Sequence, residues 1–344
     1  MAGRIAKVSL ASRCLRVVVA AGAASTLHPS VATAQLPQYR NVPTGLDLYM
    51  PVPEGNPLVG NVVALGRMLF FDPILSRDSS LACASCHDPE RGFTDGRPVS
   101  VGVFGRRGSR NVPAIINRGY GRSFFWDGRI STLEEQVLQP IQASIEMDMT
   151  IAEVISRLEH DRDYPALFRS TFGHEPNRKN LARSLAAYVR TIQSGNSPFD
   201  RLVDGDRGAL SDLEVKGLRL FQARCARCHV GPIFTDEDFH NTGVAWRDGM
   251  LSDSGRYVVS GREEHLGAFK TPTLREIART GPYMHDGSLA TLEDVIEFYD
   301  RGGNENPYLD RAMRPLNLTD REKQALVAFL RSLSGTVQEG LKEY

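Results

Sequence analysis

Two short motifs carry side chains that can hold a metal-containing cofactor. Each has two cysteines separated by two residues and followed at once by a histidine, in Cys83–His87 and in Cys225–His229. This order is the attachment signal of a c-type haem, whose iron is bound by the histidine. Zinc sites and redox dithiols also use paired cysteines, but they do not require a histidine directly after the pair. Because both copies carry that histidine, the sequence predicts two covalently bound c-type haems.

The first 34 residues differ from the rest of the chain. Basic residues come first, an apolar stretch runs from Leu15 to Ala24, and small residues follow at 32–34. This order is typical of a secretory signal peptide, so we expect a signal at 1–34 and a periplasmic protein. A disordered tail or a membrane anchor is the alternative, although the apolar stretch is too short to span a bilayer. No later run is long and apolar enough for a transmembrane helix.

Composition excludes some classes of partner. The chain has 344 residues and a formal net charge of zero, so no strong field attracts nucleic acid or an anionic membrane. Of the five cysteines, Cys14 lies in the predicted signal and the other four belong to the haem motifs. No cysteine remains for a disulfide, and we expect neither a nucleic-acid partner nor a membrane span.

An internal repeat follows the two motifs. Segments 110–140 and 269–299 share a proline, an apolar pair, an Asp-Gly turn and a Thr-Leu-Glu helix start at the same spacing. The turns are Trp126–Gly128 and His285–Gly287. Ser131 and Thr291, each followed three residues later by an acid, are helix-start signals. The repeat predicts a mainly α protein with two tandem cytochrome c-like domains, each holding one haem.

The expected domains are 45–200 and 201–335, because the segment 194–212 between them is rich in turn formers. Residues 211–229 predict a helix that leads into the second haem motif. Residues 318–335 predict a capped amphipathic helix, of the kind that packs beside the haem-attachment helix in cytochrome c folds.

The second ligand of each iron decides whether that iron is open to chemistry. With His87 and His229 as first ligands, the helix after the second turn predicts one apolar face, formed by Leu292, Val295, Ile296 and Tyr299. The position that matches Tyr299 in the first repeat is Pro140, which has no side-chain donor. A tyrosine on such a face is usually a core residue, and Met250, Met284 and Met313 are rival ligands.

The chain after the signal resembles the bacterial di-haem cytochrome c peroxidase superfamily, and within it the MauG-like branch that includes MauG and MbnH. Besides the haem motifs, the matching stretches are RNVP, FFWDGR, KTPTLRE and GPYMHDG. The resemblance implies that Tyr299 binds the second iron, where ordinary members carry methionine. It also implies an open first iron, because Val103 stands where many members carry a histidine that caps that iron.

The resemblance further implies residue roles around the first haem. Glu146 would act as acid and base on peroxide, Gln136 would line the same pocket, and Pro140 would lie over the iron. Trp126 would lie between the haems and couple them electronically. From residue types alone, Glu146 is equally a solvated carboxylate and Trp126 a core residue.

A calcium ion between the domains is also implied, held by Asn111 and by the backbone carbonyls of Thr280 and Pro282. Hard oxygen ligands of this kind suit calcium. His285 matches a structural histidine near the second haem. His240 and His265 are expected to be solvated.

The leading functional hypothesis is a periplasmic oxidase that reacts with hydrogen peroxide to form a high-valent state shared by both haem irons. It would then oxidise tryptophan of a partner protein by long-range electron transfer. The segment before the second motif has no tryptophan that could pass the electron between the haem and the protein surface, so Trp246 or a tyrosine would have to serve. The alternative is a conventional cytochrome c peroxidase fed by a small cytochrome or copper protein. A non-catalytic di-haem electron carrier is the third hypothesis, and it would need Met147 or Met149 on the first iron.

Overall fold

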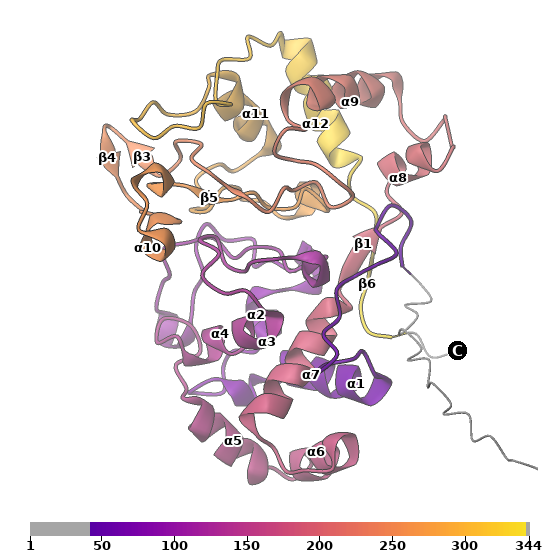
Figure 1. Cartoon of the computed structure of the whole chain (residues 1–344), viewed down its shortest axis with the longest axis vertical. Helices are drawn as coiled ribbons and strands as arrows, with labels where there is room; N and C mark the ends of the chain where they lie inside the picture. Colours follow the sequence, from indigo (N-terminus) through magenta and orange to yellow (C-terminus); the bar gives the residue numbers. More distant parts are fainter. Residues whose placement is uncertain (1–41, 342–344) are drawn as a thin grey trace, which may run out of the picture. The chain divides into compact units, whose positions relative to one another are not determined.

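The computed structural model describes residues 42–341, and the predicted signal at 1–34 lies outside this range (Figure 1). Helices dominate: α1 (Gly60–Phe71), α2 (Cys83–Cys86), α3 (Leu133–Gln136), α4 (Gln139–Gln142), α5 (Ile151–Glu159), α6 (Tyr164–Phe172), α7 (Arg178–Arg190), α8 (Pro198–Val203), α9 (Asp212–Arg224), α10 (Tyr257–Ser260), α11 (Leu292–Asp300) and α12 (Asp320–Arg331). Within 42–341, no helix has the length and apolar character that crossing a membrane requires.

The strands are short and form three antiparallel pairs in the described part of the chain. They are β1 (Gln193–Gly195) with β6 (Thr336–Gln338), β2 (Phe239–His240) with β5 (Phe269–Lys270), and β3 (Trp246–Arg247) with β4 (Met250–Leu251). Single 3₁₀ turns cover Pro73–Leu75, Pro89–Arg91, Val103–Gly105, Arg118–Tyr120, Glu263–His265 and Ile277–Arg279. The expected mainly α architecture is therefore confirmed.

A close helix crossing occurs twice, once in the first half of the described chain (residues 42–200) and once in the second half (residues 201–341). Helix α1 meets α7 at Gly66, where a Cβ atom would lie 1.9 Å from the carbonyl oxygen of Ser184. Helix α9 meets α12 at Gly217, where a Cβ atom would lie 1.9 Å from the carbonyl oxygen of Ala325. Only glycine lets the two backbones approach this closely. The C-terminal amphipathic helix thus packs on the helix that leads into the second haem motif, as the sequence predicts.

Two separate apolar cores follow from these crossings. In Figure 1, helices α1 to α7 lie together in indigo to pink, and α9, α11 and α12 lie together in red to yellow. The first core includes Leu69 and Tyr188, both fully buried, and the second includes Phe221 and Phe329, whose ring centres are 5.0 Å apart. Each half therefore buries its own apolar surface, which is the main stabilising term in folding.

The internal repeat is also present in the backbone. Each Asp-Gly turn holds one non-glycine and one glycine residue at positive φ, and each is closed by an isolated antiparallel bridge. The angles are 65° at Phe125 and 64° at Gly128, against 71° at Met284 and 63° at Gly287. Since bulky residues rarely adopt positive φ, the match of both turns indicates one duplicated local structure.

The helix after the turn differs between the repeats. Thr291 caps α11 through the backbone N–H of Asp294, as expected, but α3 is capped by Thr132 and not by Ser131. In the first repeat the helix is interrupted and forms two short helices, α3 and α4, with Pro140 in the first turn of α4. Proline has no N–H to continue the helix from α3. The second repeat has no proline here, so α11 runs unbroken to Asp300.

Contacts at the chain ends tie the halves together. Strand pairing of β1 with β6 returns the C-terminal segment to the end of α7. Arg275, which is 1 % exposed, donates hydrogen bonds to both carboxylate oxygens of Asp200 and to the carbonyl oxygen of Gly45. A buried charge is tolerated only when it is paired in this way, so this contact holds the N-terminal segment against the second half.

Candidate functional site

One cavity of about 1210 Å³ runs between the two halves, and both Cys-x-x-Cys-His motifs line it. This is larger than the roughly 300–1,000 Å³ of an ordinary single-ligand pocket. Helix α2 holds the first cysteine pair and α9 ends at the second. The space and the thiols therefore fit two covalently attached haems that share one interior.

The two histidines are oriented in the same way. The ring Nδ1–H of His87 donates to the carbonyl oxygen of Phe93 at 3.0 Å, and that of His229 donates to Phe234 at 3.0 Å. Burial lowers the pKa of both histidines, which favours the neutral ring. With Nδ1 carrying the proton, Nε2 keeps its lone pair for a metal, which is the usual outer support of an iron-binding histidine. The histidine of each motif is thus prepared to bind a haem iron.

Tyr299 lies on α11 and faces the cavity beside the second haem motif. Leu292, Val295 and Ile296 line the same wall, so the expected helix face is confirmed. The Tyr299 hydroxyl makes no hydrogen bond within residues 42–341, and burial raises its pKa above the ordinary value. The hydroxyl faces the cavity without a partner from the described protein, and a cation in the cavity would supply one.

Pro140 and Gln136 line the cavity on the side of the first haem motif. Val103 does not: its side chain is 1 % exposed in the protein core, while its backbone N–H donates to the carbonyl oxygen of Glu146 at 2.8 Å. The loop around Val103 contains no histidine and instead supports the Glu146 backbone.

Glu146 borders two spaces. It lines the cavity, and it also lines an outer hollow of about 180 Å³ together with Phe125 and Arg129. Burial raises the pKa of the Glu146 carboxyl, and the charge of Arg129 lowers it. No hydrogen bond holds the Glu146 carboxylate within the described chain, so this group borders both spaces without a fixed partner.

Trp126 lies at the contact between the halves. Its indole Nε1–H donates to the carbonyl oxygen of Asn111 at 2.9 Å, and its own carbonyl accepts from the backbone N–H of Lys270 at 2.8 Å. The Asn111 N–H in turn donates to the carbonyl of His285 at 2.7 Å. The indole is therefore held by a backbone carbonyl of the first half, and the Trp126 backbone is bonded to the second half.

The three residues suggested for calcium all line the cavity wall. The Asn111 Nδ2–H donates to the carbonyl oxygen of Arg97 at 2.8 Å, which leaves its Oδ1 as a free acceptor. The carbonyls of Thr280 and Pro282 accept no hydrogen bond within residues 42–341. Three unpaired oxygens of this kind are the donor type that calcium prefers.

The methionines divide into two groups. Met250 is 71 % exposed and does not line the cavity, which removes it as an iron ligand. Met149 is buried outside the cavity lining, whereas Met147, Met284 and Met313 line the cavity. Trp246 also lies outside the cavity wall, with its ring 6.4 Å from that of Tyr308.

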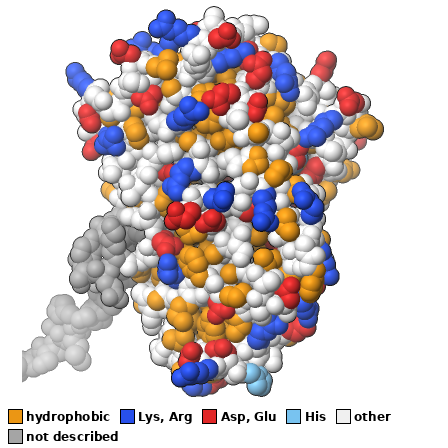
Figure 2. All heavy atoms as spheres, turned by 180° about the vertical axis from the view of Figure 1, so that it is seen from behind, with side chains coloured by type: hydrophobic (Ala, Val, Ile, Leu, Met, Phe, Trp, Pro, Cys, Tyr) orange, Lys and Arg blue, Asp and Glu red, His pale blue; other side chains and the backbone are white. Residues whose placement is uncertain are grey.

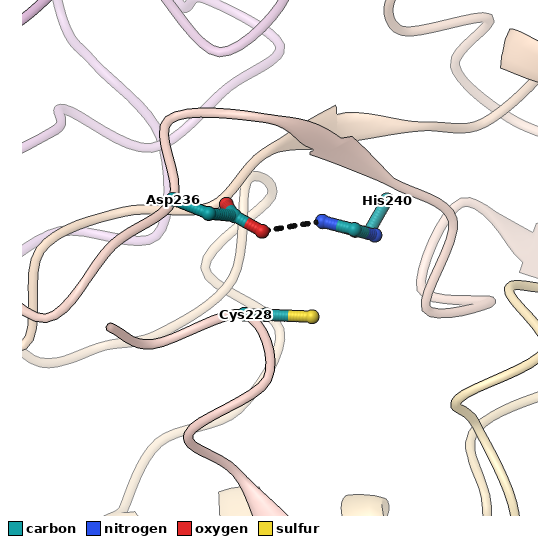
Figure 3. Close-up of side chains that lie close together, drawn as sticks. All are labelled: Cys228, Asp236 and His240. Atoms are coloured by element: carbon teal, nitrogen blue, oxygen red, sulfur yellow. Dashed lines mark hydrogen bonds and ion pairs between the residues drawn. The ribbon is translucent and has the colours of Figure 1, made fainter. Parts of the chain in front are cut away.

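His240 is not solvated, contrary to the expectation. Its ring lies between two carboxylates, with Nδ1 2.6 Å from Asp310 and Nε2 2.9 Å from Asp236. The His240 ring and Asp236 lie beside the Cys228 thiol (Figure 3). Contacts with Cys228, Asp310 and Asp236 raise the pKa of His240. His265 is half-buried and contacts the Ser260 hydroxyl.

One sequence signal could have located this cluster. Phe-Thr-Asp follows both haem motifs, at 93–95 and at 234–236, and the phenylalanine carbonyl of each copy holds the haem-motif histidine. The aspartate of the second copy pairs with His240, whereas Asp95 of the first copy keeps one buried carboxylate oxygen unpaired. The two haem surroundings are thus electrostatically unequal.

Comparisons with known proteins identify relatives over most of this chain. Residues 60–208 match the di-haem cytochrome c peroxidase family, and residues 214–334 match the cytochrome c family. The methylamine utilization protein MauG of Methylorubrum extorquens is 41 % identical over 288 residues, covering 83 % of this chain and 81 % of that protein. The cytochrome-c peroxidase IdrP1 of a Pseudomonas species is 35 % identical over 317 residues, covering 83 % of this chain and 84 % of that protein.

A solved structure is similar over most of its length. A MauG-like protein associated with microbial copper homeostasis superposes with a TM-score of 0.76 at 33 % identity, covering 88 % of this chain and 95 % of that chain. These matches confirm the two cytochrome c-like domains and support two c-type haems.

Proposed function

The chain belongs to the di-haem cytochrome c peroxidase family and is a haem-dependent oxidoreductase, and on that premise we propose that it uses hydrogen peroxide to oxidise tryptophan side chains of a partner protein. Hydrogen peroxide would take up two electrons and two protons to give two water molecules, and the partner would supply the electrons and the protons. We also propose that residues 1–34 direct the protein to the periplasm and that the domains are 45–200 and 201–335.

The observation that carries the proposal is the pair Pro140 and Tyr299. They hold matched positions after matched turns, and both line the cavity. An anionic oxygen ligand favours the oxidised metal, whereas a thioether favours the reduced metal. Tyr299 would therefore stabilise an oxidised second haem, while Pro140 would leave the first haem open to peroxide.

Bound haem supplies an iron that accepts oxidising equivalents, and the protein supplies orientation and proton transfer. His87 and His229 would hold the irons through Nε2. Glu146 would take a proton from one peroxide oxygen and return it to the other, since its raised pKa suits a group that must both accept and donate. Gln136 would hold peroxide by hydrogen bonding.

Trp126 would carry electrons between the domains, because an aromatic ring on a residue whose backbone is bonded to the other half is a favourable bridge. Asn111 accepts the hydrogen bond from that ring and is the proposed calcium ligand, together with the carbonyls of Thr280 and Pro282. Calcium bound there would hold the two halves, and hence the indole, in register.

A small cytochrome or copper protein is the alternative electron donor. This alternative is favoured by relatives named as cytochrome c peroxidases, which match over the same length of chain. Tyr299 argues for the more strongly oxidising reaction, since methionine would serve routine electron acceptance better. A non-catalytic carrier would require a ligand on the first iron, for which Met147 is the cavity-lining candidate.

Low-temperature EPR of the fully oxidised protein tests the proposal. We expect one high-spin haem, open at the first iron, and one low-spin haem with His229 and Tyr299. Two low-spin signals would show that a side chain closes the first iron and would overturn the proposal.

A further inference from the structure

The outer hollow beside Glu146 is separated from the haem cavity by very few side chains. The cavity and the hollow share Phe125, Arg129 and Glu146, and the hollow is completed by Gln139, Gln142 and Ala143. The shared side chains therefore form the partition between solvent and the space over the first haem.

Arg129 is the exposed member of this partition and is held at two points. Its Cζ atom lies 3.6 Å from the centre of the Phe125 ring, and its Nη1 donates to both carboxylate oxygens of Asp127 at 3.0 and 2.9 Å. The Arg129 side chain is nevertheless 41 % exposed. Asp127 keeps its ion pair with Arg110 when Arg129 leaves, so the Arg129 side chain can move without leaving a buried carboxylate unpaired.

Asp127 supplies a fixed anchor for that movement. It is 4 % exposed and also accepts a 2.7 Å hydrogen bond from Arg110, which pairs with Asp253 of the other half. The Arg129 backbone N–H donates to the same carboxylate at 3.2 Å. The turn therefore stays in place while the Arg129 side chain swings.

We propose that Arg129, stacked on Phe125, is a gate between solvent and the first haem that admits small molecules such as hydrogen peroxide and delays larger ones. The inference rests on the proposed function, because it requires an open first iron. Arg129 acts by position: it closes the route past Glu146 when stacked and opens it when released. Solute size then decides how often an opening is wide enough.

Ligand entry to the oxidised holoprotein tests the gate. Cyanide and imidazole are mixed separately with wild type, Arg129→Ala, Arg129→Lys and Phe125→Leu, and the Soret shift gives each association rate. We expect Arg129→Ala to speed imidazole about tenfold and cyanide much less, because only the larger probe needs the gate open. Arg129→Lys and Phe125→Leu should fall between, since each loses the stacking but keeps part of the partition. Arg207→Ala removes an exposed arginine without an ion pair among the described residues and should match wild type.

The outcomes separate the gate from the proposed function. An imidazole rate in Arg129→Ala equal to that of wild type, with cyanide binding normally, would overturn the gate and leave the peroxide function intact. Equal acceleration of both probes would also overturn it, because a loosened fold would admit both alike. No spectral change with either probe in any protein would mean a closed first iron, and both proposals would fall.

Discussion

The backbone N–H of Val103 donates a 2.8 Å hydrogen bond to the carbonyl oxygen of Glu146. This contact joins the loop before the first repeat to the proposed proton-transfer residue. Gly102 lies in the same contact, where a Cβ atom would be 2.1 Å from the carbonyl oxygen of Ile145. The loop thus fixes the Glu146 backbone, from which the carboxylate reaches the cavity.

Gly102→Ala is expected to lower the free energy of unfolding by about 1–3 kcal/mol, because the added methyl group overlaps the Ile145–Glu146 backbone. Displacing Glu146 should also slow the reaction with peroxide. Denaturant titration and stopped-flow absorbance measure the two effects. Gly60→Ala is the control, since a Cβ atom there meets nothing within 4 Å. Equal stability of both variants would argue against the close contact.

Glu146→Gln should slow the reaction with peroxide by about 10²–10⁴-fold, because the amide cannot carry the proton. Burial raises the pKa of Glu146, and the base must be ionised to accept a proton. The wild-type rate should therefore fall as the pH drops through a pKa above that of an exposed glutamate, and the variant should lose this dependence. Glu135→Gln, at an exposed position on α3, serves as control. A pH profile unchanged in Glu146→Gln would remove this residue from the mechanism.

Tyr299→Met should raise the reduction potential of the second haem by on the order of 100 mV, because a thioether stabilises reduced iron. Substrate oxidation should fall in parallel. Spectroscopic redox titration measures the first effect. Tyr283→Phe is a matched control, since Tyr283 lines the same cavity but donates its hydroxyl to the carbonyl of Ile277 at 2.9 Å. Full substrate oxidation by Tyr299→Met would contradict the role given to this tyrosine.

Removal of calcium with EGTA should lower the midpoint of thermal unfolding and alter the EPR signals of both haems, because the proposed site adjoins the Asn111–Trp126 hydrogen bond. A ligand at 100 times its Kd stabilises by about 2.7 kcal/mol. Added calcium should restore both properties, whereas magnesium should not, since it dehydrates reluctantly. Metal analysis confirms the removal. Unchanged unfolding in calcium-free protein would exclude the site.

The charges on the face in Figure 2 do not mark a docking site for a charged partner. Positive and negative side chains are interspersed on the face in Figure 2, in line with the zero net charge. On this face no single-sign field would steer a partner, so docking there would depend on shape and local pairing.

The sequence by itself determined the haem sites, the internal repeat and the apolar face that carries Tyr299. These features depend on spacing within a few residues, and helical periodicity or a covalent motif encodes such spacing directly. The matched turns around Trp126 and His285 were readable for the same reason, because both copies keep the same local order.

Tertiary structure alone decided how distant parts meet. His240 contacts Asp310 across 70 residues of chain, and Arg110 reaches Asp253 across 143. No local pattern reports such pairs, because the first forms only when the second half folds and the second only when the two halves pack. Packing of the two halves brings both haem motifs to one cavity, whereas the hollow beside Arg129 is formed within the first half by residues 125–146. Local spacing thus encodes the chemistry, and tertiary packing decides how the site is enclosed.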